Sequence, residues 1–318
     1  MQMVGRGARA LEIGNQAIHW WQTLSKQDCT AGAEVYWTAK LLAESRESLT
    51  FAGMKFAFLG AGKMAMALIQ GALRANLCSP SEIIVSSRSR SGLEALVSAT
   101  GVCAGASNAA AVSDAETVLL SVKPADALKA LEEAGNSLAG KLLISVVTGL
   151  HILTLRKAAP GCRVVRAMPN TAAMVGRSAT AIAIDSDVPR TDISTAERLF
   201  SAVGEIFTVS ENQLDAVTGL SGSGPAFVYL VMEALSDGGV SAGLPRKLSQ
   251  ELAIQTVAGA AKMAATTKEH PALLREMVAS PGGTTIAGLA VLEHAAVRSA
   301  FIGAVKAAAA RSKELSAE

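Results

Sequence analysis

The chain has 318 residues, a formal net charge of +2 and an apolar fraction of 50%, which allows a sizeable core and two domains. Its lysines and arginines form no basic stripe, so we do not expect nucleic acid as a partner. No apolar run reaches the length of a membrane span, and the four cysteines lack zinc-site or disulfide spacing. We therefore expect a soluble protein without a metal site, and isolated thiols fit a reducing compartment such as the cytoplasm.

Residues 1–53 differ in character from the rest of the chain. They hold all three tryptophans, and their acidic and basic residues balance. They lack the apolar block of a signal peptide, and their acids weaken a transit role without removing it. We expect an N-terminal extension that is either disordered or a transit segment. An alternative translation start and an artefact are further explanations of this segment. A transit segment would place the protein in a plastid instead of the cytoplasm.

The first convincing strand, residues 55–59, leads into the sequence GAGKMA at positions 60–65 and then into helical spacing. The pattern G-x-G-x-x-A is a dinucleotide-binding fingerprint. Gly60 permits the tight turn, Gly62 lets a pyrophosphate approach the backbone, and Ala65 keeps the helix close to the sheet. Because strand, turn and helix occur in the required order, the sequence predicts nucleotide binding here.

A second strand, residues 82–86, ends in Ser87 and Arg88, where an NAD-dependent enzyme usually has an acid. Hydroxyl and guanidinium groups suit the additional phosphate of NADP, so we predict NADPH with NADH as a weaker alternative. Further strands are expected within residues 114–122 and 142–147. The carboxyl ends of parallel strands share one edge of a sheet, where nucleotides bind.

From about Thr191 onward the apolar spacing becomes helical, and one final helix is expected from roughly Thr285 to Leu315. These helices are apolar around much of their circumference, so that a single small domain could not bury them all. Helices of a second chain are the natural cover, which predicts a homodimer.

Residues 278–286 (VASPGGTTI) read as a helix N-terminus that can hold an anion. Ser280 is expected as the cap and Pro281 as the first helical residue, with two bare glycines in the first turn. Amides and hydroxyls without a cation suit a carboxylate on a small neutral or cationic body. Upstream, residues 217–227 (VTGLSGSGPAF) interrupt a helical pattern with three glycines and a proline.

These two segments, in this order behind a dinucleotide-binding half, resemble pyrroline-5-carboxylate reductase, from about Lys55 to Leu315. The resemblance implies an α/β Rossmann-type dinucleotide-binding domain over residues 54–212 and an all-α dimerisation domain over residues 213–318. It implies reduction of L-1-pyrroline-5-carboxylate to L-proline with NAD(P)H. It also implies a homodimer with interleaved helices, with assembly up to a decamer as an option.

The resemblance also implies which residues surround the cofactor, with the pyrophosphate on residues 59–64 and the ribose phosphate near Ser87. Met277 replaces a polar residue that contacts the cofactor in relatives, so that contact is not expected. The implied cofactor residues are Leu59, Gly60, Ala61, Gly62, Lys63, Met64, Ser87, Arg88, Asn108, Ser121, Val122, Lys123, Pro124, Val147, Thr148 and Gly149.

Reduction of a protonated cyclic imine needs little side-chain chemistry, because the carbon beside the nitrogen is already electrophilic. The four histidines accordingly show no acid-base or metal spacing. The resemblance implies that Thr285 is catalytic and hydrogen-bonds the ring nitrogen. Glu211 matches a family acid near the substrate, although an exposed helix-start carboxylate is an equal alternative. The expected substrate residues are Glu211, Ser280, Gly282, Gly283, Thr284 and Thr285.

Two other functions stay open at this point. A related NADP-dependent dehydrogenase of hydroxy or imino acids would share the fold, but hydroxy-acid chemistry usually needs a lysine or histidine base, and none is evident beside the turn. A non-enzymatic sensor or scaffold could use the same fold. The presence of Thr284, Thr285 and the two glycines of the turn argues against that alternative.

Overall fold

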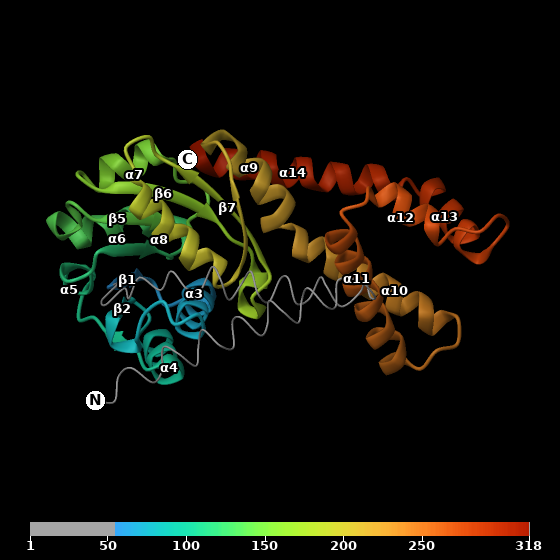
Figure 1. The fold of residues 1–318 in the computed structure, drawn as a ribbon, viewed down its shortest axis with the longest axis horizontal. Coiled ribbons are helices and arrows are strands. Elements are labelled where there is room, and N and C mark those ends of the chain that lie inside the picture. The colour runs from blue at the N-terminus through green and yellow to red at the C-terminus, as the bar shows by residue number, and fades with distance from the viewer. Residues whose placement is uncertain (1–54, 318) are drawn as a thin grey trace, which may run out of the picture. The chain divides into compact units, whose positions relative to one another are not determined.

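The structure, a computed structural model, describes residues 55–317, all of which belong to one compact unit (Figure 1). The predictions made for residues 1–53 lie outside the described residues. Within the described part, strands and helices alternate in the first half and the second half is helical, as expected for an α/β domain followed by an all-α domain.

An eight-stranded sheet organises the first half, in the order β3-β2-β1-β4-β5-β6-β7-β8. From β1 to β6 neighbouring strands are parallel, which confirms the predicted nucleotide-binding sheet. In contrast, β7 is antiparallel to β6 and parallel to β8. The strands are β1 (Phe56–Leu59), β2 (Ile83–Ser86), β3 (Cys103–Ala104), β4 (Thr117–Leu120), β5 (Leu142–Ser145), β6 (Arg163–Met168), β7 (Ser178–Ile184) and β8 (Gly204–Thr208).

The expectation that strands end at about Thr191 was wrong, because β8 follows later in the chain. This strand lies at the edge of the sheet and is mostly exposed, so its sequence lacks a buried apolar run. Its pairing with β7 supplies the partner that the local sequence does not reveal.

Helices cover both faces of this sheet, which gives three layers. Phe56 and Phe58 of β1 pack in one core cluster with residues of α3, α4 and α8, whereas Ala57 and Leu59 pack in a second with α5, α6 and α7. The helices of this half are α3 (Lys63–Arg74), η1 (Pro80–Glu82), α4 (Arg90–Thr100), α5 (Asn108–Ser113), α6 (Pro124–Ala134), η2 (Gly135–Leu138), α7 (Ile152–Ala158), η3 (Thr171–Val175) and α8 (Arg190–Ser201).

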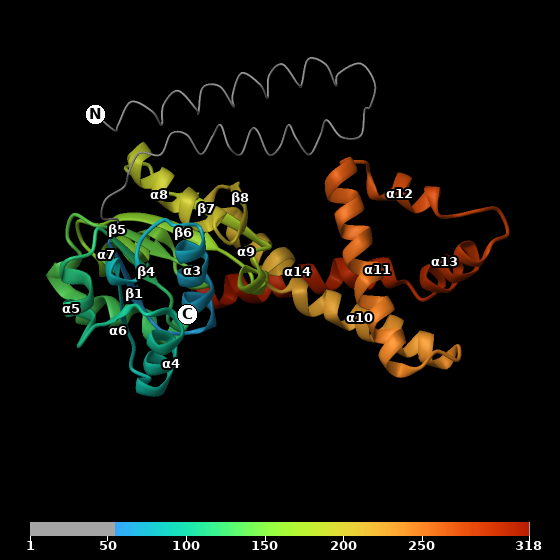
Figure 2. The ribbon, with the colours of Figure 1, turned by 60° about the horizontal axis from the view of Figure 1, so that its bottom comes forward.

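The second half is helical, as predicted. In it α10 and α11 lie side by side, and α14 packs on α9 and η5 (Figures 1 and 2). The predicted domain boundary between residues 212 and 213 falls inside η4, and it stays a prediction. The elements are η4 (Glu211–Gln213), α9 (Leu214–Val217), η5 (Thr218–Gly222), α10 (Gly224–Ser241), α11 (Arg246–Thr267), α12 (Pro271–Met277), α13 (Thr284–His294) and α14 (Val297–Ala317).

The glycine-rich segment allows a close helix contact at Gly219. A Cβ atom there would lie 2.6 Å from the Val305 carbonyl oxygen and 2.8 Å from the Ala309 nitrogen, both in α14. Only a residue without a side chain fits at this distance. The segment therefore joins α14 to the region where the two halves of the chain meet in sequence.

The expected single helix from Thr285 to Leu315 was wrong, because α13 and α14 are separate helices bent by 51°. Ala296, between them, has a φ of 54°, in the left-handed region that ends a helix. Alanine favours helix by propensity, so the local sequence gives no signal for this break.

Large apolar side chains of these helices are exposed in the single chain. Leu230, Met277 and Val291 are 64%, 70% and 68% exposed. Within the described part no single helix is long and apolar enough to cross a bilayer, although the bent pair α13 and α14 together meets the length and composition criteria. Exposed apolar helix faces on this scale indicate a surface that another chain covers.

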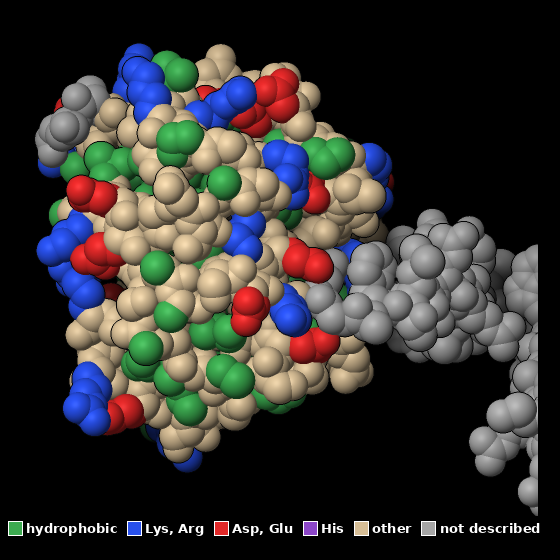
Figure 3. Space-filling model, turned by 90° about the vertical axis from the view of Figure 1, so that its left-hand side faces the viewer, with side chains coloured by type: hydrophobic (Ala, Val, Ile, Leu, Met, Phe, Trp, Pro, Cys, Tyr) green, Lys and Arg blue, Asp and Glu red, His purple; other side chains and the backbone are tan. Residues whose placement is uncertain are grey.

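On the face shown in Figure 3, basic and acidic side chains are interspersed among polar and apolar ones. Opposite charges at short intervals cancel much of each other's field, and salt screens what remains beyond about 10 Å. This face of the described residues therefore carries no stripe of a single charge.

Candidate active site

A cleft of about 430 Å³ lies where β1, β2 and β4 end. Strand order reverses at this place, because β1 lies between β2 and β4, and nucleotides bind at such a point. The structure brings together here the predicted cofactor residues Gly60, Ala61, Gly62, Ser87, Arg88, Asn108, Ser121, Val122 and Lys123.

The turn between β1 and α3 has the geometry of a phosphate site. Gly60 has a φ of 111°, and a Cβ atom there would lie 2.7 Å from the Ser121 carbonyl oxygen. At Gly62, in contrast, a Cβ atom would meet nothing within 4 Å, and no side chain caps α3. The first intrahelical bond runs from Met66 to Gly62, so the amides of Lys63 and Met64 are left for an anion.

Hydrogen bonds inside the chain hold other parts of this cleft. The Ser86 hydroxyl donates to Asn108 Oδ1 at 2.6 Å, and Asn108 Nδ2 donates to Glu133 Oε2 at 2.8 Å. The Ser121 hydroxyl donates to the carbonyl oxygen of Leu59 at 3.1 Å. Leu59 is fully buried, so it supports Ser121 and does not line the cleft.

Arg88 forms an ion pair with Asp126, an acid that the sequence analysis did not single out. Asp126 lies in the first turn of α6 and lines the cleft. The Arg88 side chain is 64% exposed and that of Asp126 is 24% exposed. The sequence contained a signal for this acid, because Asp126 follows Pro124 by two residues and acids are favoured in the first turn of a helix.

The predicted cofactor residues Pro124 and Val147 to Gly149 are not among those that line this cleft. Thr148 Oγ1 donates to Met168 Sδ at 3.9 Å. Gly149 has a φ of 85°, and a Cβ atom there would lie 3.0 Å from the Leu315 carbonyl oxygen of α14. Residues 147–149 follow β5, which lies next to β4 at the same edge of the sheet, and their contact with the nicotinamide stays a prediction.

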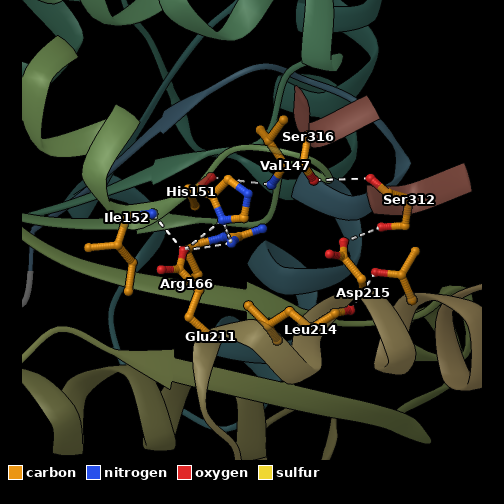
Figure 4. A network of polar contacts seen from close by, with 11 residues as sticks. Val147, His151, Ile152, Arg166, Glu211, Leu214, Asp215, Ser312 and Ser316 are labelled. Atoms are coloured by element: carbon orange, nitrogen blue, oxygen red, sulfur yellow. Dashed lines mark hydrogen bonds and ion pairs between the residues drawn. The ribbon is translucent and has the colours of Figure 1, made fainter. Parts of the chain in front are cut away.

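Glu211 is neither exposed nor free (Figure 4). Its Oε1 atom accepts hydrogen bonds from the Ile152 amide at 2.6 Å and from Arg166 Nη1 at 2.7 Å. Burial raises the Glu211 pKa, but these two hydrogen bonds and the nearby charges outweigh it, so that the pKa is below its usual value. Since the Arg166 side chain is 6% exposed, Glu211 neutralises a buried cation and caps α7.

A second polar contact in Figure 4 anchors the end of α14. The Ser312 hydroxyl donates to Asp215 Oδ1 of α9 at 2.7 Å, and the Ser316 hydroxyl donates to the Ser312 carbonyl oxygen at 3.0 Å. The Ser312 bond joins α14 to α9, and the contact between Leu315 and Gly149 places the end of α14 beside the loop that follows β5.

The segment from Ser280 to Gly283 is a turn that precedes α13, which corrects the expectation that Ser280 and Pro281 begin the helix. The Gly283 amide donates to the Ser280 carbonyl oxygen at 3.0 Å, and Gly282 has a φ of 66°. Proline second and a left-handed glycine third define a type II turn. The left-handed Gly282 cannot continue a helix, so α13 begins at Thr284.

This turn changes which groups can hold a carboxylate. The Gly283 amide is already bonded within the turn, so this amide is not free for the carboxylate that Gly283 was expected to bind. The first intrahelical bond runs from Ala287 to Gly283, which leaves the amides of Thr284, Thr285 and Ile286 for an anion. Gly283 offers no capping side chain, and a Cβ atom there would collide with the Ser280 hydroxyl.

Two of the described histidines have contacts within the chain. His151 Nδ1 lies 3.6 Å from Glu211 Oε1, and His270 Nδ1 accepts from the Ala272 amide at 3.2 Å. Among residues 55–317, no three His, Cys, Asp or Glu side chains converge as a metal site would require. The site therefore has to be understood from its amides, hydroxyls and charged pairs.

Two family models match the chain. One, described as "Pyrroline-5-carboxylate reductase dimerisation", matches residues 211–315. The other, described as "NADP oxidoreductase coenzyme F420-dependent", matches residues 55–149. The first model covers the turn before α13, and the second covers the nucleotide cleft.

Individual relatives extend over both halves. A pyrroline-5-carboxylate reductase of Synechocystis is 44% identical over 82% of this chain and 98% of its own length. The structure of such a reductase from Coxiella burnetii has 37% identity and a TM-score of 0.77, over 83% of this chain and 98% of that one. The Plasmodium falciparum pyrroline carboxylate reductase, solved with NADP bound, has 32% identity and a TM-score of 0.76, over the same shares of the two chains. The chain therefore belongs to the pyrroline-5-carboxylate reductase family.

Proposed function

We propose that this chain reduces L-1-pyrroline-5-carboxylate to L-proline with NAD(P)H, the final step of proline biosynthesis. The observation that carries the proposal is that the family relationship spans both the nucleotide cleft and the turn before α13. An inactive scaffold would not need an open phosphate site and three free amides at a helix start.

The cleft fits a dinucleotide by its own geometry. The amides of Lys63 and Met64 would hold the pyrophosphate, because Gly62 leaves the helix N-terminus open. Ser87 and Arg88 would bind the 2′-phosphate, which supports a preference for NADPH over NADH. When bound, the reduced nicotinamide supplies the hydride.

The turn before α13 fits the substrate carboxylate. The amides of Thr284, Thr285 and Ile286 point toward the positive end of the helix, where an anion is stabilised. Thr285, which is half-buried, would donate its hydroxyl hydrogen bond to the ring nitrogen or assist its protonation. The chain's task is then to hold a carbon that is already electrophilic at contact distance from the cofactor.

A complete site needs a second copy of the chain. Figures 1 and 2 draw α13 and β1 at opposite ends of the described residues. The carboxylate turn of one protomer would therefore meet the nucleotide cleft of its partner. Exposed apolar side chains on α10 to α14 support interleaved helices as the dimer contact, and assembly to a decamer stays a prediction.

A steady-state assay tests the activity directly. The wild type is expected to oxidise NADPH only when pyrroline-5-carboxylate is present, and Gly62→Glu is expected to fold but not to bind NADPH. A Cβ atom at Gly62 meets no neighbour, so the variant changes the phosphate site without disturbing the core. A wild type that reduces a keto acid and not the imine would assign the chain to the alternative dehydrogenase class.

Co-expression tests the shared site. Gly62→Glu impairs the cleft and Thr285→Val impairs the turn, so a mixed dimer would contain one intact site if each site combines two protomers. Random pairing should then recover about a quarter of wild-type turnover. If each site lies within one chain, the mixture will be no more active than its parent variants.

A further inference from the structure

An acid opposes the cation on which NADP preference depends. Arg88 lies in the loop between β2 and α4, and its partner Asp126 lies in the first turn of α6. Both residues line the nucleotide cleft. The ion pair therefore joins two walls of the cleft at the position proposed for the 2′-phosphate.

Asp126 differs from the other acid of the cleft, Glu133. Glu133 accepts a hydrogen bond from Asn108 at 2.8 Å and lies 4.0 Å from Lys129, so it is held by residues outside the expected phosphate contact. Asp126, in contrast, is held by Arg88 itself. Its position in the first turn of α6 also keeps its charge favourable, because carboxylates are stabilised at a helix N-terminus.

We propose that Asp126 is a specificity-determining residue whose carboxylate competes with the 2′-phosphate of NADP for Arg88. This inference rests on the proposed function. A 2′-phosphate that binds Arg88 must displace Asp126 and then face its like charge. NAD has only a hydroxyl there, leaves the ion pair intact and can donate a hydrogen bond to a carboxylate. Asp126 therefore lowers the affinity for NADP relative to the affinity for NAD.

Binding to the free protein measures this competition without catalysis. Calorimetric titration of the full chain with adenosine 2′,5′-bisphosphate and with adenosine 5′-monophosphate isolates the contribution of the 2′-phosphate. We expect Asp126→Asn to bind the bisphosphate about two- to fivefold more tightly, the range that an exposed ion pair supports. Affinity for the monophosphate should be unchanged or lower, and added salt should shrink the gain.

Two controls distinguish competition for Arg88 from a general effect of removing a negative charge. Glu94→Gln removes an acid of α4 that pairs with Arg90 and does not line the cleft, so it should change neither affinity. In an Arg88→Ala background, Asp126→Asn should gain much less, because no guanidinium is left to release.

The outcomes are distinct. The inference is overturned if the Asp126→Asn variant binds the bisphosphate as tightly as the wild type does. It is also overturned if the variant binds both nucleotides more weakly, because the ion pair would then help to hold the cofactor. A full gain in the Arg88→Ala background would also overturn it. If the wild type itself fails to bind either nucleotide, the proposed function fails instead.

Discussion

Removal of the Glu211 carboxylate should destabilise the protein strongly, because it leaves a buried cation without its partner. The Arg166 side chain is 6% exposed and that of Glu211 is 30% exposed. Breaking a buried ion pair costs about 3–5 kcal/mol, and the partial exposure of Glu211 reduces this to about 2–4 kcal/mol for Glu211→Ala. The variant also leaves the Ile152 amide at the start of α7 unbonded.

Urea unfolding at fixed protein concentration measures this loss. Glu205→Ala, on the exposed edge strand β8, is the control and should change little. The double variant Arg166→Met with Glu211→Leu should lose less than Glu211→Ala, since it leaves no buried charge. A Glu211→Ala variant within about 0.5 kcal/mol of the wild type, below the cost of a lost buried partner, would refute the reasoning.

The same ion pair predicts a pH dependence. The folded pKa of Glu211 lies below its ordinary value of 4.5, so the carboxylate stabilises the fold fully above about pH 4.5 and less as the pH falls below it. The stability difference between the wild type and Glu211→Gln should therefore shrink in acid. A difference that stays constant down to acid unfolding would show that charge is not involved.

Three further predictions concern separate parts of the chain. Burial raises the pKa of the Cys78 and Cys162 thiols to about 11, so alkylation at neutral pH should label exposed Cys103 before either of them. Mass spectrometry that finds equal labelling of these three described cysteines would contradict this. Gly219→Ala should cost about 1–3 kcal/mol in urea unfolding because of its collision with α14, whereas Gly259→Ala, where a Cβ atom meets nothing, should be neutral or stabilising. Thr285→Val should lower turnover about ten- to a thousandfold while calorimetry finds NADPH binding unchanged, and wild-type turnover would remove any chemical role of the hydroxyl.

The sequence predicted well those features that a few neighbouring residues determine. The strand, glycine turn and helix from β1 to α3 follow from apolar spacing and from the backbone freedom of Gly60. The start of α13 also depends on neighbouring residues, but the prediction for it was wrong. Proline followed by glycine serves a type II turn as well as a helix start, and only the left-handed Gly282 distinguishes them.

The sequence could not predict contacts between distant segments. Arg88 pairs with Asp126, and Arg166 with Glu211, through the order of strands and helices around the sheet. The edge strand β8 likewise depends on its pairing with β7, which local propensity does not encode, and the alanine at position 296 gives no local signal for the helix break there.

Transfer of labelled hydride tests the central claim most directly. The wild type is mixed with pyrroline-5-carboxylate and NADPH that carries deuterium at the reactive position of the nicotinamide, and the product is analysed by mass spectrometry. The account predicts proline with a single deuterium on the former imine carbon, and no labelled proline from Gly62→Glu. Oxidation of NADPH without labelled proline, or equal labelling by both proteins, would contradict it.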